Sequence, residues 1–305
     1  MTSRWRALDV SLALVRMSRP AQLALIVLVY TAGVLLGMVR GGDRPPAEIA
    51  LGGLLLLLAA VSVHHANEYA DILTDSLTPR TRFSGGSGVL PAGVIDPGIA
   101  RCTAAISAVA TSIAGLALHR AGLFSDAALL ILMTGLIGGL AYSIPPVAAS
   151  RRGLGEIVNA LLGGLLLPLY GVAVARGSVT ALDLVAFVPF TLLVFLSVMA
   201  TAWPDRTADA AAGKRTLQVR LGARWLRLIH GITIVLFVVA EGTAAVIGAS
   251  PAAPLTLAVL PLLLVAQQRY TVVSAPTVSV AAMVFAALAL TLIFGVVLVV
   301  AGLRP

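Results

Sequence analysis

The sequence predicts an all-α, polytopic membrane protein, with nine transmembrane helices in one bundle around a central cavity. Hydrophobic residues make up 59% of the 305 residues and charged residues only 11%, and the mean hydropathy is +1.01. These values exclude an ordinary soluble domain. The apolar residues also form runs of about 20, the length that crosses a bilayer as a helix. We expect a single domain over residues 1–305, because no soluble, low-complexity or clearly repeated tract interrupts the runs.

The individual elements follow from these runs. Residues 1–19 mix arginines with aliphatic residues, which is typical of an amphipathic helix at the membrane interface. A cleaved signal peptide is not expected there, because the apolar stretch that follows is too long. Taking about 20 residues for each span, we predict transmembrane helices over residues 20–39, 47–71, 97–118, 126–144, 154–175, 181–203, 225–247, 254–267 and 278–302.

The basic residues orient the bundle. With the N-terminus in the cytoplasm, 16 of the 21 Lys and Arg residues fall on the cytoplasmic side and 5 on the external side. This positive-inside bias predicts a multi-pass protein of the cytoplasmic membrane with an external C-terminus. It also accounts for the net charge of +8 without nucleic acid as a partner. The single cysteine, Cys102, excludes an internal disulfide and a thiolate metal cluster.

An acidic motif ends the second predicted span. Asn67, Asp71 and Asp75 are spaced four apart, so on a helix their polar groups share one face. Apolar sequence reaches right up to them, which predicts that they face a cavity at the membrane boundary. Placing ionisable groups at that depth costs free energy, so we interpret them first as functional residues. The alternative is a helix end that frays into water.

A second motif, Asp205 and Asp209, ends the sixth predicted span and lies on the same cytoplasmic side. Together with Glu68, Asp71 and Asp75 it holds five of the 13 acidic residues. Such a concentration needs positive charge, and Mg²⁺ is a hard cation that prefers oxygen ligands. We therefore expect a magnesium site formed by both motifs, in which Asn67 contributes an amide oxygen and Glu68 is the weakest ligand.

Two long cytoplasmic connections carry basic residues and glycines. The first holds Arg80, Arg82 and the run Gly85-Gly86-Ser87-Gly88, and the second holds Lys214 and Arg215. Arginine, lysine and exposed backbone N–H groups bind phosphate oxygens. These four basic residues are thus candidate diphosphate contacts, and the alternative for each is a purely topological charge.

A diphosphate site that opens onto a lipid-depth cavity suggests a polyprenyl diphosphate, whose apolar chain would lie between helices. Bound metal would stabilise the departing diphosphate, and the dry interior would protect an allylic cation from water. An acceptor would then attack C1. The sequence on these grounds favours an enzyme that transfers a prenyl group.

The same residues resemble the UbiA superfamily of intramembrane prenyltransferases, which have nine transmembrane helices and two Asp-rich motifs. Residues 67–75 resemble the motif NDxxDxxxD, with Glu68 in place of the usual aspartate, and residues 205–209 resemble DxxxD. Residues 142–146, with the sequence YSIPP, are similar to a YSxPP segment of that family. The resemblance implies that Tyr142 lines the cavity, where it stabilises the cation or orients the acceptor.

A narrower resemblance is to the 1,4-dihydroxy-2-naphthoate polyprenyltransferases of menaquinone biosynthesis. It rests on RGLGE at residues 152–156 and GKRTLQVRLG at residues 213–222. It implies an aromatic acceptor, with the naphthoate ranked above hydroxybenzoate. A terpene cyclase on the same scaffold is the nearest alternative. A divalent-cation transporter is disfavoured, because its carboxylates would lie near the bilayer midplane.

Overall fold

The computed structural model describes residues 3–81 and 83–301, and within these ranges the chain is helical with no strand. The all-α prediction is confirmed. The helices are α1 (Ser3–Met17), α2 (Pro20–Val39), α3 (Pro46–Ala70), α4 (Ile72–Leu77), α5 (Pro97–Arg120), α6 (Asp126–Ser143), η1 (Ala149–Arg151), α7 (Gly155–Ala160), η2 (Leu161–Leu166), α8 (Leu167–Arg176), α9 (Ala181–Ala202), α10 (Arg206–Ala211), α11 (Leu217–Arg220), α12 (Ala223–Val246), α13 (Ala253–Thr256), η3 (Leu257–Val259), α14 (Leu260–Arg269) and α15 (Thr277–Val300).

Eight helices in the described ranges are long and apolar enough to cross a membrane, and α7, η2 and α8 together form one of them. Where the eighth span was predicted, at residues 254–267, the structure has an apolar helical stretch, Ala253–Arg269, that is shorter than the spans. Prolines stand in the first turn of both α13 and α14, and a 3-10 turn separates the two pieces. Proline lacks the backbone N–H that a continuous helix requires at that position, which explains the break.

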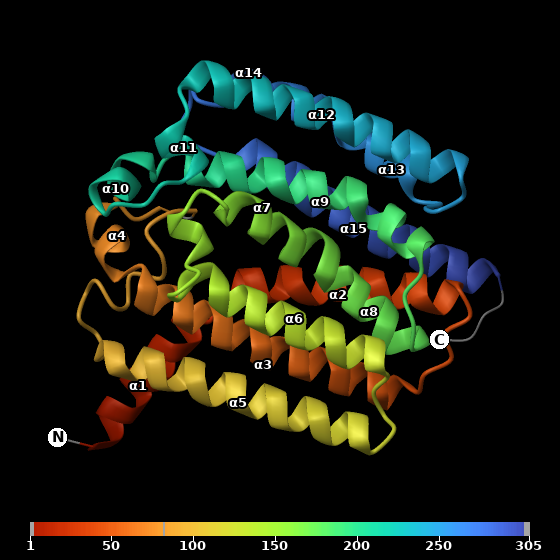
Figure 1. Ribbon diagram of the computed structural model, residues 1–305, viewed down its shortest axis with the longest axis horizontal. Helices are drawn as coiled ribbons and strands as arrows, with labels where there is room; N and C mark the ends of the chain where they lie inside the picture. Colours follow the sequence, from red (N-terminus) through yellow and green to blue (C-terminus); the bar gives the residue numbers. More distant parts are fainter. Residues whose placement is uncertain (1–2, 82, 302–305) are drawn as a thin grey trace.

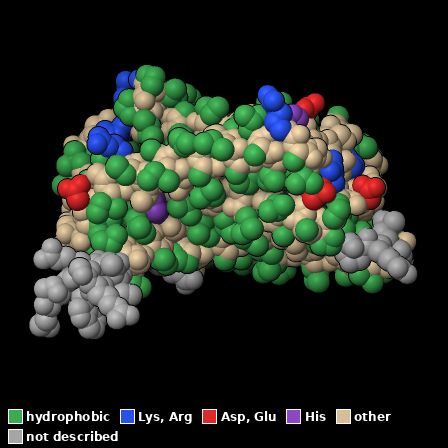
Figure 2. Space-filling model, turned by 90° about the horizontal axis from the view of Figure 1, so that it is seen from below, with side chains coloured by type: hydrophobic (Ala, Val, Ile, Leu, Met, Phe, Trp, Pro, Cys, Tyr) green, Lys and Arg blue, Asp and Glu red, His purple; other side chains and the backbone are tan. Residues whose placement is uncertain are grey.

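The long helices lie roughly side by side, and the short helices α4, α10 and α11 gather at one end of the bundle (Figure 1). The surface agrees with a lipid environment. On the face in Figure 2, hydrophobic side chains cover the middle, while most charged side chains lie towards the ends. On α5 the exposed residues include Ile106 at 67% and Ile113 at 64%. We infer that these side chains face lipid.

Helices α2 and α8 make the closest contact in the bundle. A Cβ atom on Gly33 would lie 1.9 Å from the carbonyl oxygen of Pro168, and one on Gly171 would lie 2.4 Å from that of Tyr30. Small residues allow backbones to approach in this way, which is how membrane helices gain packing energy. Helices α2 and α8 are therefore packed backbone against backbone at these two positions.

An ion-pair cluster closes the end of the bundle away from α4 and α10. The fully buried carboxylate of Asp183, at the start of α9, pairs with Arg40 after α2 and with Arg176 at the end of α8. Thr180 caps the same helix through a reciprocal hydrogen-bond pair with Asp183. These contacts join three chain segments where the helices would otherwise splay.

The helix that carries the first acidic motif is not continuous. Helix α3 ends at Ala70, Asp71 has φ −102° and ψ 9°, and α4 begins at Ile72. The spacing of one turn nevertheless persists, because Asp71 N–H donates to Asn67 O at 2.9 Å and Asp75 N–H donates to Asp71 O at 2.8 Å. The three polar side chains therefore remain on one side, as the sequence predicted, across a bend that it did not predict.

Candidate active site

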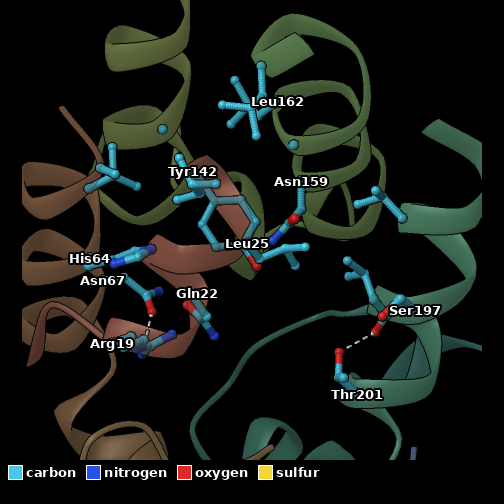
Figure 3. A pocket seen from close by; sticks show the side chains of 18 of the residues that line it. Arg19, Gln22, Leu25, His64, Asn67, Tyr142, Asn159, Leu162, Ser197 and Thr201 are labelled. Atoms are coloured by element: carbon cyan, nitrogen blue, oxygen red, sulfur yellow. Dashed lines mark hydrogen bonds between the residues drawn. The ribbon is translucent and has the colours of Figure 1, made fainter. Parts of the chain in front are cut away.

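A cavity of about 1000 Å³ lies between α2, α3, α6, α7, η2, α9 and α15. Its inner wall is apolar, and its polar end lies beside α4 and α10, under the loop that includes Phe83–Gly86. Figure 3 shows Tyr142 and Asn159 pointing into the same space, with Ser197 and Thr201 of α9 across from them. The cavity therefore has a polar end that continues into an apolar interior, which suits a hydrocarbon chain.

The first acidic motif lines the polar end. Asn67 donates from Nδ2 to Asp71 Oδ2 at 3.0 Å and to Ser143 Oγ at 3.1 Å, while its Oδ1 accepts from Arg19 Nη2 at 3.0 Å. Asp71 and Asp75 also line the cavity. These bonds orient the amide and the first carboxylate before any ligand arrives.

The second motif faces the first across the same opening, because α10 packs against α4. Asp205 is the residue before α10 and Asp209 lies in its first turn, and both line the cavity. Lys214 bridges the motifs: its Nζ lies 2.9 Å from Asp71 Oδ1 and 3.5 Å from Asp209 Oδ1. The two clusters that the sequence placed on one membrane side meet at one cavity mouth.

Electrostatics at this mouth are strongly perturbed. Burial and the nearby charge of Asp71 raise the pKa of Asp75 from 3.8 to about 7, and burial and the charge of Asp209 raise the pKa of Asp205 to about 7 as well. Burial would lower the pKa of Lys214, but Asp71 and Asp209 outweigh it, so this pKa is raised. Crowded carboxylates in a poorly solvated place repel one another, so the site favours additional positive charge.

The donor set fits Mg²⁺. Asn67, Asp71 and Asp75 on one side and Asp205 and Asp209 on the other offer only oxygen donors to a cation. Within the described residues, Asp75 Oδ2 and Asp205 Oδ1 are buried and accept no hydrogen bond. No three His, Cys, Asp or Glu side chains in that part of the chain stand close enough to hold one ion between them, and the Lys214 ammonium occupies the space between the motifs.

A glycine-rich loop covers Asp75. Gly86 has φ +57°, and a Cβ atom there would lie 2.1 Å from Asp75 Oδ2. Only glycine adopts this backbone conformation readily and leaves this space free. The loop therefore forms a backbone cradle directly over the carboxylate.

Glu68 holds this loop and lies outside the cavity wall. It is 1% exposed, pairs with Arg19 at 2.6 Å, and accepts hydrogen bonds from the backbone N–H and the hydroxyl of Ser87. On a helix, neighbouring residues point about 100° apart, so Glu68 faces away from the side that Asn67 presents to the cavity. The structure thus gives the predicted weak ligand other partners.

The other predicted diphosphate contacts are placed unequally. Lys214 is buried on the cavity wall, whereas Arg80 and Arg215 are exposed and do not line the cavity. Arg82 lies outside the described residues. Arg19, which the sequence indicated only as a topological charge, lies on the wall beside Asn67. Its position directly before Pro20, the start of the first span, was the available signal.

Tyr142, Asn159 and Glu156 form a polar strip further along the wall. All three line the cavity, and the Asn159 side chain reaches the Tyr142 hydroxyl. The sequence predicted Tyr142 through its motif, but it singled out neither the side chain of Asn159 nor that of Glu156. Ser197 and Thr201, on the opposite wall, were also missed, because isolated serines and threonines in apolar helices usually bond to their own backbone.

The fold and the site define the class of this protein: a helical membrane protein with an apolar cavity between its helices, headed by two carboxylate clusters and a lysine. The sequence pattern of the UbiA prenyltransferase family matches residues 25–290. The chain belongs to the UbiA prenyltransferase family. No curated protein matches it.

Solved structures with the same fold are distant in sequence. A UbiA homologue from Archaeoglobus fulgidus bound to GPP and Mg²⁺ is 18% identical with a TM-score of 0.72, covering 93% of this chain and 99% of that one. An apo UbiA homologue from Aeropyrum pernix K1 is 18% identical with a TM-score of 0.60, covering 92% and 98%. A digeranylgeranylglyceryl phosphate synthase is 16% identical with a TM-score of 0.66, covering 92% and 96%.

Proposed function

We propose that this protein is a Mg²⁺-dependent intramembrane prenyltransferase that moves a polyprenyl group from its diphosphate to an aromatic acceptor. The observation that carries the proposal is the meeting of Asp71, Asp209 and Lys214 at the polar mouth of an apolar cavity. The Archaeoglobus homologue binds a prenyl diphosphate together with Mg²⁺, and the likeness in fold supports the same ligands here. The whole chain acts as one domain in this proposal.

We assign metal binding and diphosphate binding to different residues of the site. Asn67, Asp71, Asp75, Asp205 and Asp209 would hold Mg²⁺, with Glu68 fixing the loop above them. Bound Mg²⁺ supplies Lewis-acid stabilisation of the leaving diphosphate. Lys214 adds an ammonium donor for diphosphate oxygens from the cavity wall. We propose that Arg19 also faces the diphosphate, since its guanidinium lies on the same wall.

The cavity body favours the chemistry that follows. As the C1–O bond breaks, both electrons leave with the diphosphate, and the allylic cation remains in a space from which apolar side chains exclude water. The Tyr142 ring can stabilise this cation through its π face or orient the acceptor. An electron pair of the acceptor ring then forms the bond to C1, and the ring loses a proton.

For the acceptor we propose 1,4-dihydroxy-2-naphthoate, which makes the reaction a step of menaquinone biosynthesis. The support is the pair of segments at residues 152–156 and 213–222, which lie beside the cavity and contact each other. We also propose a location in the cytoplasmic membrane, with the N-terminus and the acidic end in the cytoplasm. The charge bias supports this orientation.

The test uses purified protein in liposomes with Mg²⁺ and labelled geranyl or longer diphosphates. Each is incubated with the naphthoate, with hydroxybenzoate or without acceptor. A prenylated product that requires the naphthoate supports the proposal. A product with hydroxybenzoate alone reassigns the acceptor, and diphosphate release with a cyclic hydrocarbon indicates a terpene cyclase.

Two variants test the metal site in the same assay. Asp71→Ala and Asp205→Ala should each abolish turnover, because each removes a proposed oxygen ligand, while the thermal transition of the folded protein persists. Asp126→Ala is the matched control, since that carboxylate is 98% exposed at the start of α6. Full activity of either cavity variant would remove these carboxylates from the mechanism.

A further inference from the structure

Glu156 carries a carboxylate that the metal site does not use. It lies in the first turn of α7, is 3% exposed, and lines the cavity. Its Oε1 accepts the backbone N–H of Leu217 at 2.9 Å. Its Oε2 is buried and has no hydrogen-bond partner in the described part of the chain. A buried carboxylate oxygen without a partner is rare and calls for a ligand or a solvent donor.

Two chain segments hold this carboxylate in place. Arg215 N–H donates to Arg151 O at 3.0 Å, and Leu217 N–H donates to Glu156. Gly153 has φ +80°, and a Cβ atom there would lie 2.7 Å from Arg215 O. The segment before α7 is therefore fastened to the loop that carries Lys214, so Glu156 is fixed relative to the diphosphate end of the cavity.

The surroundings of Glu156 suit a flat ring with polar substituents. Gly155 lies between two neighbours, since a Cβ atom there would be 2.9 Å from Ser150 Cα and 3.4 Å from Tyr142 Cε2. Ser150 lines the cavity, and its Oγ is also buried without a partner in the described chain. Figure 3 shows Tyr142 and Asn159 together on this wall. The strip thus offers an aromatic face beside two unpaired oxygens.

A purely structural role accounts for only one of the two carboxylate oxygens of Glu156. Binding the N–H of Leu217 requires one oxygen, and the other is buried and has no partner in the described part of the chain. The hydroxyl group of a ligand is a donor that can satisfy a lone carboxylate oxygen beside an apolar cavity.

We propose that Glu156 Oε2 accepts a hydrogen bond from a hydroxyl group of the aromatic acceptor, whose ring lies against Tyr142. This inference rests on the proposed function and deepens it, because it restricts the acceptor to phenols and aromatic diols. A site built to bind a hydroxyl rejects the analogue that lacks it, since its buried polar group is then left unpaired. Glu156 is thus a specificity residue for the acceptor.

Glu156→Gln tests the inference most sharply. The amide oxygen of glutamine can keep the bond from Leu217, while its NH₂ group replaces the unpaired acceptor Oε2 with a donor. The KM for 1,4-dihydroxy-2-naphthoate should rise about tenfold or more, as expected for a hydrogen bond to a charged group. Mg²⁺-dependent binding of geranyl diphosphate, measured by calorimetry, should stay within about twofold. Glu241→Gln is the matched control: Glu241 is also 3% exposed but does not line the cavity.

The dimethyl ether of the naphthoate supplies a second measurement that needs no variant. The wild-type protein should bind the free diol at least about tenfold more tightly than the ether, and Glu156→Gln should lose this preference. Equal binding of diol and ether by the wild type, or an unchanged preference in the variant, overturns the inference. Failure of the wild type to bind geranyl diphosphate with Mg²⁺ would instead overturn the proposed function, so the two failures are distinguishable.

Discussion

The backbone cradle over Asp75 makes the substitution Gly86→Ala a quantitative test of the site. The new Cβ atom would lie 2.1 Å from Asp75 Oδ2, whereas ordinary contacts begin at 3.4 Å, so the loop or the carboxylate must move by 1.3 Å. Displacing a reacting or positioning group by about 1 Å can reduce a rate by about 100-fold. We therefore expect Mg²⁺-dependent turnover to fall by about two orders of magnitude.

Gly93 provides the control in the same loop. It has φ +65°, and a Cβ atom there would meet nothing within 4 Å. Both substitutions place alanine in a left-handed conformation, which costs about 1–2 kcal/mol, and Gly86→Ala adds the clash with Asp75, so Gly93→Ala measures the backbone cost alone. Only Gly86→Ala should lose activity and require more Mg²⁺ in a titration of turnover. Equal activity of the two variants would refute the role that we give to the cradle.

Two further predictions concern charge. Because burial and nearby carboxylates raise the pKa of Asp75 and of Asp205 to about 7, protonation favours the folded protein, and the stabilisation is lost as pH rises from about 4 through 7. Mg²⁺ must displace these protons, so its affinity should rise about tenfold per displaced proton between pH 6 and pH 8; calorimetry that finds a flat profile would contradict the shifts. Arg19→Ala leaves the buried Glu68 carboxylate, whose side chain is 0% exposed, without its cation and should destabilise the protein by about 3 kcal/mol in denaturation. Arg44→Ala breaks a pair in which the Glu48 side chain is 16% exposed to solvent, and it should cost about 0.5 kcal/mol. Similar losses for the two arginine variants would argue against a special role for the Glu68 contact.

Helix starts were predictable because their signals are local. The starts predicted at residues 20, 97 and 126 agree with α2, α5 and α6. Proline tolerates the first helical turn, and the Ser125 and Asp96 side chains accept hydrogen bonds from backbone N–H groups of α6 and α5. The π-helical turns of η2 and the bend at Asp71 were not predictable, because tertiary packing around the cavity selects them over a regular helix that the same residues could form.

The same contrast between local signals and long-range contacts applies to the residues of the site. The spacing within each acidic motif is encoded locally, so both motifs were visible in the sequence. The contact of Glu156 with Leu217 joins residues 61 positions apart, and that of Arg19 with Glu68 joins residues 49 apart. Contacts between residues so far apart leave no periodic pattern in the sequence, so the sequence does not reveal them. For Glu68 the motif indicated a metal ligand, but in the structure its two carboxylate oxygens accept hydrogen bonds from Arg19 and Ser87.

The arrangement of Lys214 explains how so many acids share one poorly solvated mouth. Four aspartates line it, and like charges this close disfavour the folded state unless they are neutralised or protonated. Lys214 lies within 3.5 Å of an aspartate from each motif, and its backbone N–H donates to Asp209 O at 2.8 Å. The lysine therefore reduces the repulsion and also couples the position of its loop to both motifs. Because that loop leads into Leu217, whose N–H binds Glu156, the acidic mouth of the cavity and the wall around Glu156 are connected through this segment of the chain.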